Sequence, residues 1–94
     1  MIDFEKVEGL DFRVEKIGEQ FNDPGVSWRP GRVAISGTIP NAIEEDLATP
    51  VNIEITIPVS TDGTLTLLQF EVKAKRQALL LMEVVLNRLR QDAS

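Results

Sequence analysis

The residue types that perform most enzyme chemistry are missing from this 94-residue sequence, which contains no histidine, cysteine or tyrosine. Histidine is the commonest general base, and imidazole and thiolate groups are the usual ligands of transition metals. A Ser–His–Asp or Cys–His arrangement is therefore impossible within one chain. Ser27, Ser36 and Ser60 lie in no Gly-x-Ser-x-Gly or Ser-x-x-Lys context, so we interpret them as turn or strand-surface residues.

Carboxylates are the remaining candidates for chemistry. The run Glu44-Glu45-Asp46 could attract a hard cation, but it lacks the spaced oxygen ligands and the glycine of a calcium loop. Asn41 followed by Glu44 resembles a capping box, which predicts a short helix over Ala42–Ala48 with these acids at its positive end. We predict no catalytic residue, no metal site and no cofactor, and therefore not an enzyme. A phosphate-binding loop is not expected either, because the glycines are too widely spaced.

The charge distribution argues against nucleic acid as a partner. The chain has a net charge of -5, and residues 1–46 carry ten acidic against five basic side chains. Binding to a phosphate backbone requires a basic face. Residues 1–6 lack the basic and apolar regions of a signal peptide, and no apolar run reaches the ~18 residues of a membrane span. We expect a cytoplasmic protein with one domain over residues 1–94, and no membrane contact.

The C-terminal third is expected to be a helix with too much apolar surface for one sheet. From Ala78 to Leu86 only Glu83 is polar. A helix on a sheet buries a single stripe, which is predicted here to comprise Ala78, Leu79, Met82, Val85, Leu86 and Leu89. Three apolar residues fall outside the stripe, and a partner chain would cover them. The predicted interface residues are Leu80, Leu81, Val84, Arg88 and Trp28.

Trp28, the single tryptophan, lies between two turn sequences, Asn22–Gly25 and Pro30-Gly31. It is either an aromatic anchor for a partner or a plug over one end of the core, with its indole N–H bonded to the backbone. Both interpretations remain open from the sequence.

Alternating apolar and polar residues predict strands at Leu10–Val14, Arg32–Ile39 and Val51–Val59. Pro58 cannot donate to a ladder, so its end of the last strand should lie at a sheet edge. Asp62-Gly63 fits a two-residue turn, which would pair Val51–Val59 with a further strand over Thr66–Val72. The helix would then begin between Ala74 and Gln77, without a cap, and fray from Gln91 onward.

The predicted fold class is therefore α+β: a mostly antiparallel sheet of about four strands with the C-terminal helix packed on one face. Whether the helix packs on its own sheet or on that of a neighbouring chain stays open.

The order of these features resembles SecB-type export chaperones over residues 10–72. The resemblance rests on Leu10-Asp11-Phe12, on Trp28-Arg29-Pro30 opening a strand, on Val51–Val59, and on Phe70-Glu71-Val72. It implies an antiparallel sheet followed by helices, assembly into dimers of dimers, and binding of unfolded client chains in apolar grooves. This chain is shorter and has fewer aromatic residues to line such a groove.

Three function hypotheses follow. The first is a non-catalytic, self-associating interaction protein, chaperone-like or adaptor-like, that forms a homo-oligomer or binds another protein. The second is an acidic binding module, of the immunity or anti-factor type, for one specific basic protein. The third is an enzyme acting through carboxylates or lysine alone.

Overall fold

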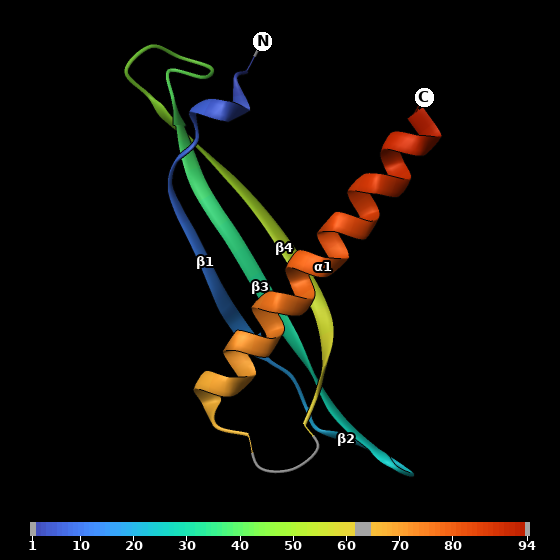
Figure 1. The fold of residues 1–94 in the computed structure, drawn as a ribbon. Coiled ribbons are helices and arrows are strands. Elements are labelled where there is room, and N and C mark those ends of the chain that lie inside the picture. Colours follow the sequence, from blue (N-terminus) through green and yellow to red (C-terminus); the bar gives the residue numbers. More distant parts are fainter. Residues whose placement is uncertain (1, 62–64, 94) are drawn as a thin grey trace.

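The computed structural model describes residues 2–61 and 65–93, and within these ranges four strands form one antiparallel sheet with a long helix across one face (Figure 1). A short 3-10 helix, η1 (Phe4–Lys6), precedes the strands β1 (Glu8–Ile17), β2 (Phe21–Asp23), β3 (Val26–Pro40) and β4 (Ala48–Ser60). The helix α1 (Leu67–Ala93) follows them. The predicted α+β fold class is confirmed.

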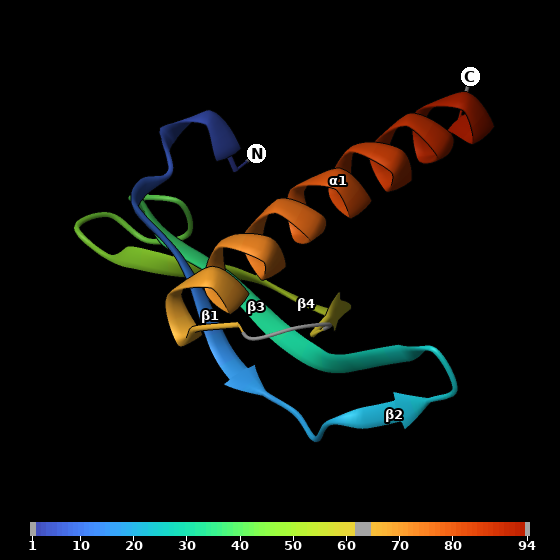
Figure 2. The ribbon, with the colours of Figure 1, turned by 60° about the horizontal axis from the view of Figure 1, so that its bottom comes forward.

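The long strand β3 organises the sheet. Its residues 31–38 pair with β1, its residues 26–28 pair with β2, and its residues 28–40 pair with β4. Because β4 occupies one side of β3 along its length, β1 and β2 lie end to end on the other side (Figure 2). The outer side of β4 is therefore an edge of the sheet, as Pro58 predicts.

The predicted strands are confirmed, although each observed strand is longer. Leu10–Val14 lies within β1, Arg32–Ile39 within β3 and Val51–Val59 within β4. The predicted turn at Asn22–Gly25 is also confirmed, and it joins β2 to β3 with Gly25 at a φ of 84°. A positive φ at this position favours glycine.

The helix predicted over Ala42–Ala48 is wrong, because residues 41–47 form an irregular loop between β3 and β4 and Ala48 already belongs to β4. The Asn41 side chain accepts a hydrogen bond from the backbone N–H of Asp46 at 2.6 Å. The backbone N–H of Asn41 donates to the carbonyl of Leu47 at 3.0 Å. Asn41 has a φ of 56°, whereas an N-cap residue is extended. The acidic run Glu44-Glu45-Asp46 is consequently exposed on a loop and caps nothing.

The strand predicted over Thr66–Val72 is also wrong, because α1 begins at Leu67. Thr66 and Gln69 form a reciprocal capping box. The Gln69 N–H donates to Thr66 Oγ1 at 3.1 Å, and the Thr66 N–H donates to Gln69 Oε1 at 3.0 Å. The helix starts earlier than predicted and continues through Gln91–Ala93, which were expected to fray. The turn predicted at Asp62-Gly63 lies outside the described residues.

Removing this cap gives the first testable prediction. Thr66→Ala is expected to lower the free energy of unfolding by about 1 kcal/mol, because the Gln69 N–H loses its acceptor at the first turn of α1. Urea unfolding followed by circular dichroism measures the change. Thr38→Ala, at an exposed position of β3, is the control and should stay within about 0.5 kcal/mol. Equal losses in the two variants would contradict the capping role.

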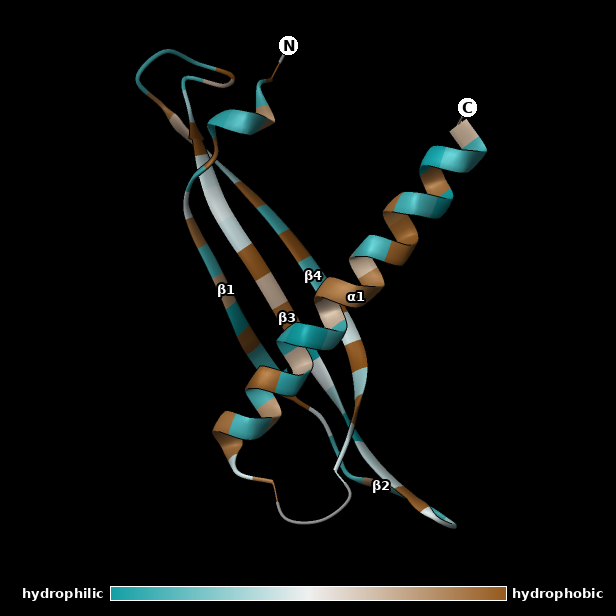
Figure 3. Ribbon diagram, in the orientation of Figure 1, coloured by the Kyte–Doolittle hydropathy of each residue, from teal (hydrophilic) through white to brown (hydrophobic). Residues whose placement is uncertain are grey.

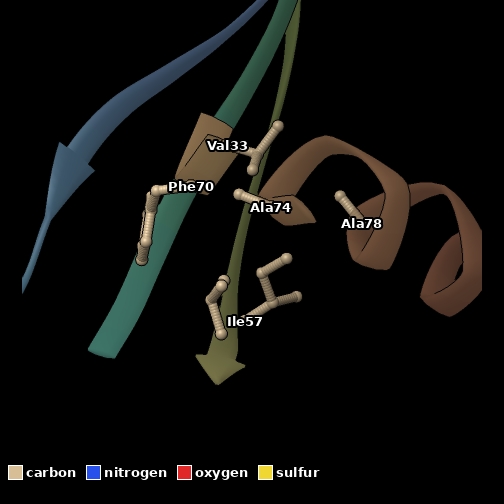
Figure 4. Packing of buried hydrophobic residues seen from close by; sticks show 6 residues of the cluster. Val33, Ile57, Phe70, Ala74 and Ala78 are labelled. Carbon is tan, nitrogen blue, oxygen red and sulfur yellow. The ribbon is translucent and has the colours of Figure 1, made fainter. Parts of the chain in front are cut away.

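The core lies between α1 and the face of the sheet that carries the odd-numbered residues of β3 and β4. Its buried members are Val33, Ile57, Val59, Phe70, Ala74 and Ala78 (Figure 4). Helix residues spaced by four face the sheet, and alanine at two of these positions lets the helix backbone approach closely. A Cβ atom at Gly31 would lie only 3.2 Å from the Phe70 ring and 3.5 Å from the Ala74 Cβ, so glycine accommodates the helix here.

The apolar stripe predicted to be buried on the sheet is mostly exposed. Of its six members only Ala78 is buried, and Met82 is half-buried. Because α1 begins about two turns earlier than predicted, the first half of the helix supplies the contacts with the sheet. The remaining apolar residues of the helix lie farther along it, beyond the core.

Candidate interaction surface

The second half of α1 extends past the edge of the sheet (Figures 1 and 2). We call residues 79–93 the outer half of α1. Between positions 79 and 89 seven leucine and valine side chains are 42–59 % exposed: Leu79, Leu80, Leu81, Val84, Val85, Leu86 and Leu89. Hydrophobic segments alternate with hydrophilic ones along this part of the helix (Figure 3). The apolar surface of a helix is normally buried, so these seven side chains lack their cover in the single chain.

Three predicted interface residues come together on one side of the outer half. Leu80, Leu81 and Val84 line an open hollow of about 300 Å³ together with Ile57, Pro58 and Gln77. Arg88 is exposed four residues beyond Val84, one helical turn farther along the same side. The hollow therefore joins the helix to the outer edge of β4.

A second hollow, with a volume of about 320 Å³, shares Leu81 with the first. Its lining is entirely apolar: Ile53, Ile55, Leu81, Met82, Val85 and Leu86. Ile53 also lines a third hollow of about 420 Å³ toward η1, which includes Phe4, Leu10 and Val51. The exposed apolar surface of the helix thus continues onto the uncovered part of the sheet through Ile53. The sequence did not identify this region because Met82, Val85 and Leu86 were predicted to be buried in the core.

Trp28 lies apart from the other predicted interface residues. It pairs with Phe21 across the β2–β3 hairpin, and the two rings stack with centroids 4.6 Å apart and planes 15° apart. The hairpin lies at the end of the sheet away from the outer half of α1 (Figure 1). Trp28 is half-buried and does not belong to the core cluster between the helix and the sheet. Its ring stacking is therefore local to the hairpin.

The charged groups are all at the surface among the described residues, where no polar or charged side chain is buried. Arg13 and Asp11 form an ion pair on β1, with both side chains about half exposed. Lys75 lies over the ring of Phe12, with Nζ 5.6 Å from the ring centroid, which is a favourable cation–π geometry. In residues 2–61 and 65–93 no group of three acidic side chains is placed to hold a metal ion.

Comparisons with known proteins supply no family. No protein-family model matches the sequence, and no curated protein or solved structure matches it. The resemblance to SecB-type chaperones therefore stays a prediction. In the part of the chain that the structure describes, no helix has the length and apolar character needed to cross a membrane.

Proposed function

We propose that this chain is a non-catalytic protein-interaction protein, chaperone-like or adaptor-like, that self-associates through the outer half of α1. The observation that supports the proposal is the exposure of seven leucine and valine side chains within eleven consecutive residues of one helix. Monomeric proteins rarely expose a contiguous apolar patch of more than a few hundred Å². Covering this patch supplies the driving force for association, at about 25 cal/mol per Å² buried.

A second copy is the partner that the chemistry of this surface favours. In a two-fold dimer the same patch lies on both sides of the interface, so an apolar surface meets an apolar surface. Between positions 79 and 87 Glu83 is the single charged residue, which limits like-charge repulsion between two such helices. Arg88 would lie at the rim, where a charged head can stay in water.

The test is a charge placed at the centre of this patch. Val84→Glu is expected to weaken the homodimer at least about hundredfold, because each copy would bury an unpaired carboxylate. Size-exclusion chromatography with light scattering over a range of protein concentrations measures the dissociation constant.

Leu47→Glu is a matched control, because Leu47 is 49 % exposed, similar to the 52 % of Val84, and lies in the β3–β4 loop. The control should leave the mass of the dimer unchanged. A wild-type chain that is monomeric at all concentrations, or a Val84→Glu dimer of undiminished affinity, would overturn the proposal. Circular dichroism of both variants separates loss of association from loss of folding.

A further inference from the structure

The two outer edges of the sheet differ in their capacity to pair with another strand. The ladder of β1 is interrupted between Glu8 and Asp11 and again between Val14 and Lys16. The ladder of β4 runs without a shift over all 13 residues from Ala48 to Ser60. Bulges bend and twist an edge strand, and they are a common means of preventing edge-to-edge pairing. The edge of β4 lacks that protection.

The hydrogen bonds of β3 determine which groups of β4 point outward. The carbonyl of Pro30 accepts from the Gly18 N–H at 2.8 Å, so Pro30 is turned toward the β1 side. Pro30 is opposite Pro58, and this pair therefore exchanges no hydrogen bonds. Thr61 directly follows β4, and its N–H donates to the carbonyl of Ser27 at 2.9 Å. The odd-numbered residues of β4 therefore direct their backbone groups toward β3. Even-numbered residues consequently present their backbone groups to the open edge.

Prolines limit the outward-facing donors to a short central segment. Pro50 and Pro58 have no N–H, so the donors between them are those of Asn52, Glu54 and Thr56. An antiparallel copy of the same strand, centred on Glu54, places Asn52 opposite Thr56 and Pro50 opposite Pro58. In this register each proline faces a proline, and every donor between them meets an acceptor. A shift by two residues places Pro58 opposite Asn52 or Pro50 opposite Thr56, and the carbonyl of Asn52 or Thr56 then faces a residue without an N–H.

We propose that β4 pairs antiparallel with β4 of a second copy around Glu54, which joins the two sheets into one. This inference rests on the self-association proposed above and assigns its geometry. The two-fold axis then passes perpendicular to the sheet, so both α1 helices lie on the same face and run antiparallel.

The position of α1 also supports a pairing of the two β4 strands that is centred on Glu54. The helix crosses β4 and projects over the space beyond its edge, where the second strand would lie (Figures 1 and 2). Ile53 and Ile55 flank Glu54 and line the apolar hollow formed with Met82, Val85 and Leu86. The donors of the edge and the uncovered apolar side chains thus lie at the same height along β4. One contact with a second copy would satisfy the donors and cover the outer half of α1.

Cysteine cross-linking tests this geometry, because the natural chain contains no cysteine. Paired Cα atoms at a hydrogen-bonded position of an antiparallel ladder are about 5.5 Å apart, within the range of roughly 4.4–6.8 Å that a disulfide spans. Glu54→Cys should therefore form a disulfide-linked dimer under mild oxidation. Arg13→Cys is the matched control: Arg13 and Glu54 both pair with Ala34, one at each edge of the sheet, and both are exposed. The control should react at least about tenfold more slowly.

Mixing two single-cysteine variants tests the register. Asn52→Cys and Thr56→Cys should cross-link with each other when mixed, because these positions face one another across the axis. Each variant alone should react slowly, because the two identical positions are about 13 Å apart at a strand rise of ~3.3 Å per residue. A different pattern of reactive pairs would overturn the register centred on Glu54.

The affinity of the dimer tests the same pairing without any cysteine. The proposed register places Glu54 opposite its own copy, and like charges directly opposite each other destabilise a ladder. Glu54→Gln should therefore tighten the dimer by a few-fold at low salt, and the gain should shrink at high salt. In a dimer that formed through the helices alone, this change would act only through the net charge of each chain, and its effect would be smaller.

The outcomes separate the two proposals. A wild-type chain that stays monomeric overturns both. A dimer that Val84→Glu disrupts, but in which Glu54→Cys does not cross-link and Glu54→Gln has no effect, overturns β4 pairing and leaves self-association standing. Faster cross-linking of Arg13→Cys than of Glu54→Cys would assign the paired edge to β1 instead. Cross-linking at Glu54 together with a tighter Glu54→Gln dimer supports the proposal.

Discussion

Replacing Ala74 with glutamate is expected to detach α1 from the sheet. Ala74 is fully buried, and its Cβ would lie 3.5 Å from a Cβ atom placed on Gly31 of β3. A glutamate there would be too large for the contact, and its carboxylate would lie in an apolar core without a partner. An uncompensated buried charge costs roughly 3–5 kcal/mol, a large part of the ~5–15 kcal/mol that stabilises a small protein.

Urea unfolding monitored by circular dichroism measures this loss, with all variants at one protein concentration because association adds to apparent stability. Arg76→Glu is the control, since Arg76 is exposed two residues farther along the same helix. It should change the unfolding free energy by no more than about 0.5 kcal/mol. Similar losses in the two variants would mean that helix charge, and not burial at Ala74, determines the effect.

Truncating Phe70 is expected to cost about 3–5 kcal/mol, because Phe70→Ala opens a cavity in the core. Phe70 is 4 % exposed, and its ring lies against the backbone of Gly31. The ring also packs with Val33 and Ile57 beneath the first turns of α1 (Figure 4). Its loss should therefore weaken the attachment of the helix in addition to the core of the sheet.

Phe4→Ala provides the comparison, because Phe4 lies in η1 and is 66 % exposed. This substitution should lower the free energy of unfolding by less than about 1 kcal/mol. Phe70→Leu should recover part of the lost stability, since it refills most of the volume. Chemical unfolding of the three variants measures these differences. Equal values for Phe70→Ala and Phe4→Ala would exclude the packing described for Phe70.

The strands were predictable because the sheet has one apolar face. Alternation in Val51–Val59 follows directly from a strand whose odd-numbered residues face the helix side and whose even-numbered residues face water. The turn at Asn22–Gly25 was predictable from the backbone preferences of proline and glycine. The loop between β3 and β4 was not, because Asn41 can either cap a helix or bond across a loop, and the choice depends on the strands that hold the ends of the loop.

The start of α1 was mispredicted because residues 66–72 fit both the alternation of a strand and the spacing of a helix. Leu68, Phe70 and Val72 alternate as in a strand, whereas Phe70, Ala74 and Ala78 are spaced by four as in a helix. A turn at Asp62-Gly63 favoured the strand. The capping box of Thr66 and Gln69 is the local signal for the helix.

The sequence predicted that α1 carries more apolar surface than one sheet can cover, but not where the surplus lies. That position depends on the angle at which the helix crosses the sheet. The helix comes close to the sheet at Gly31 and Ala74, and a linear pattern does not contain this contact.

The helix α1 is attached to the sheet at its N-terminal end only, so a small change in its direction moves its C-terminal end. The last contact of a buried helix residue with the sheet is at Ala78, and fifteen further residues extend from that point to Ala93. At 1.5 Å per residue, a tilt of about 10° at Ala78 would displace the tip by roughly 4 Å. A larger side chain at Ala78 would therefore change the direction of the outer half of α1. The apolar surface of that half would move without any change in its residues.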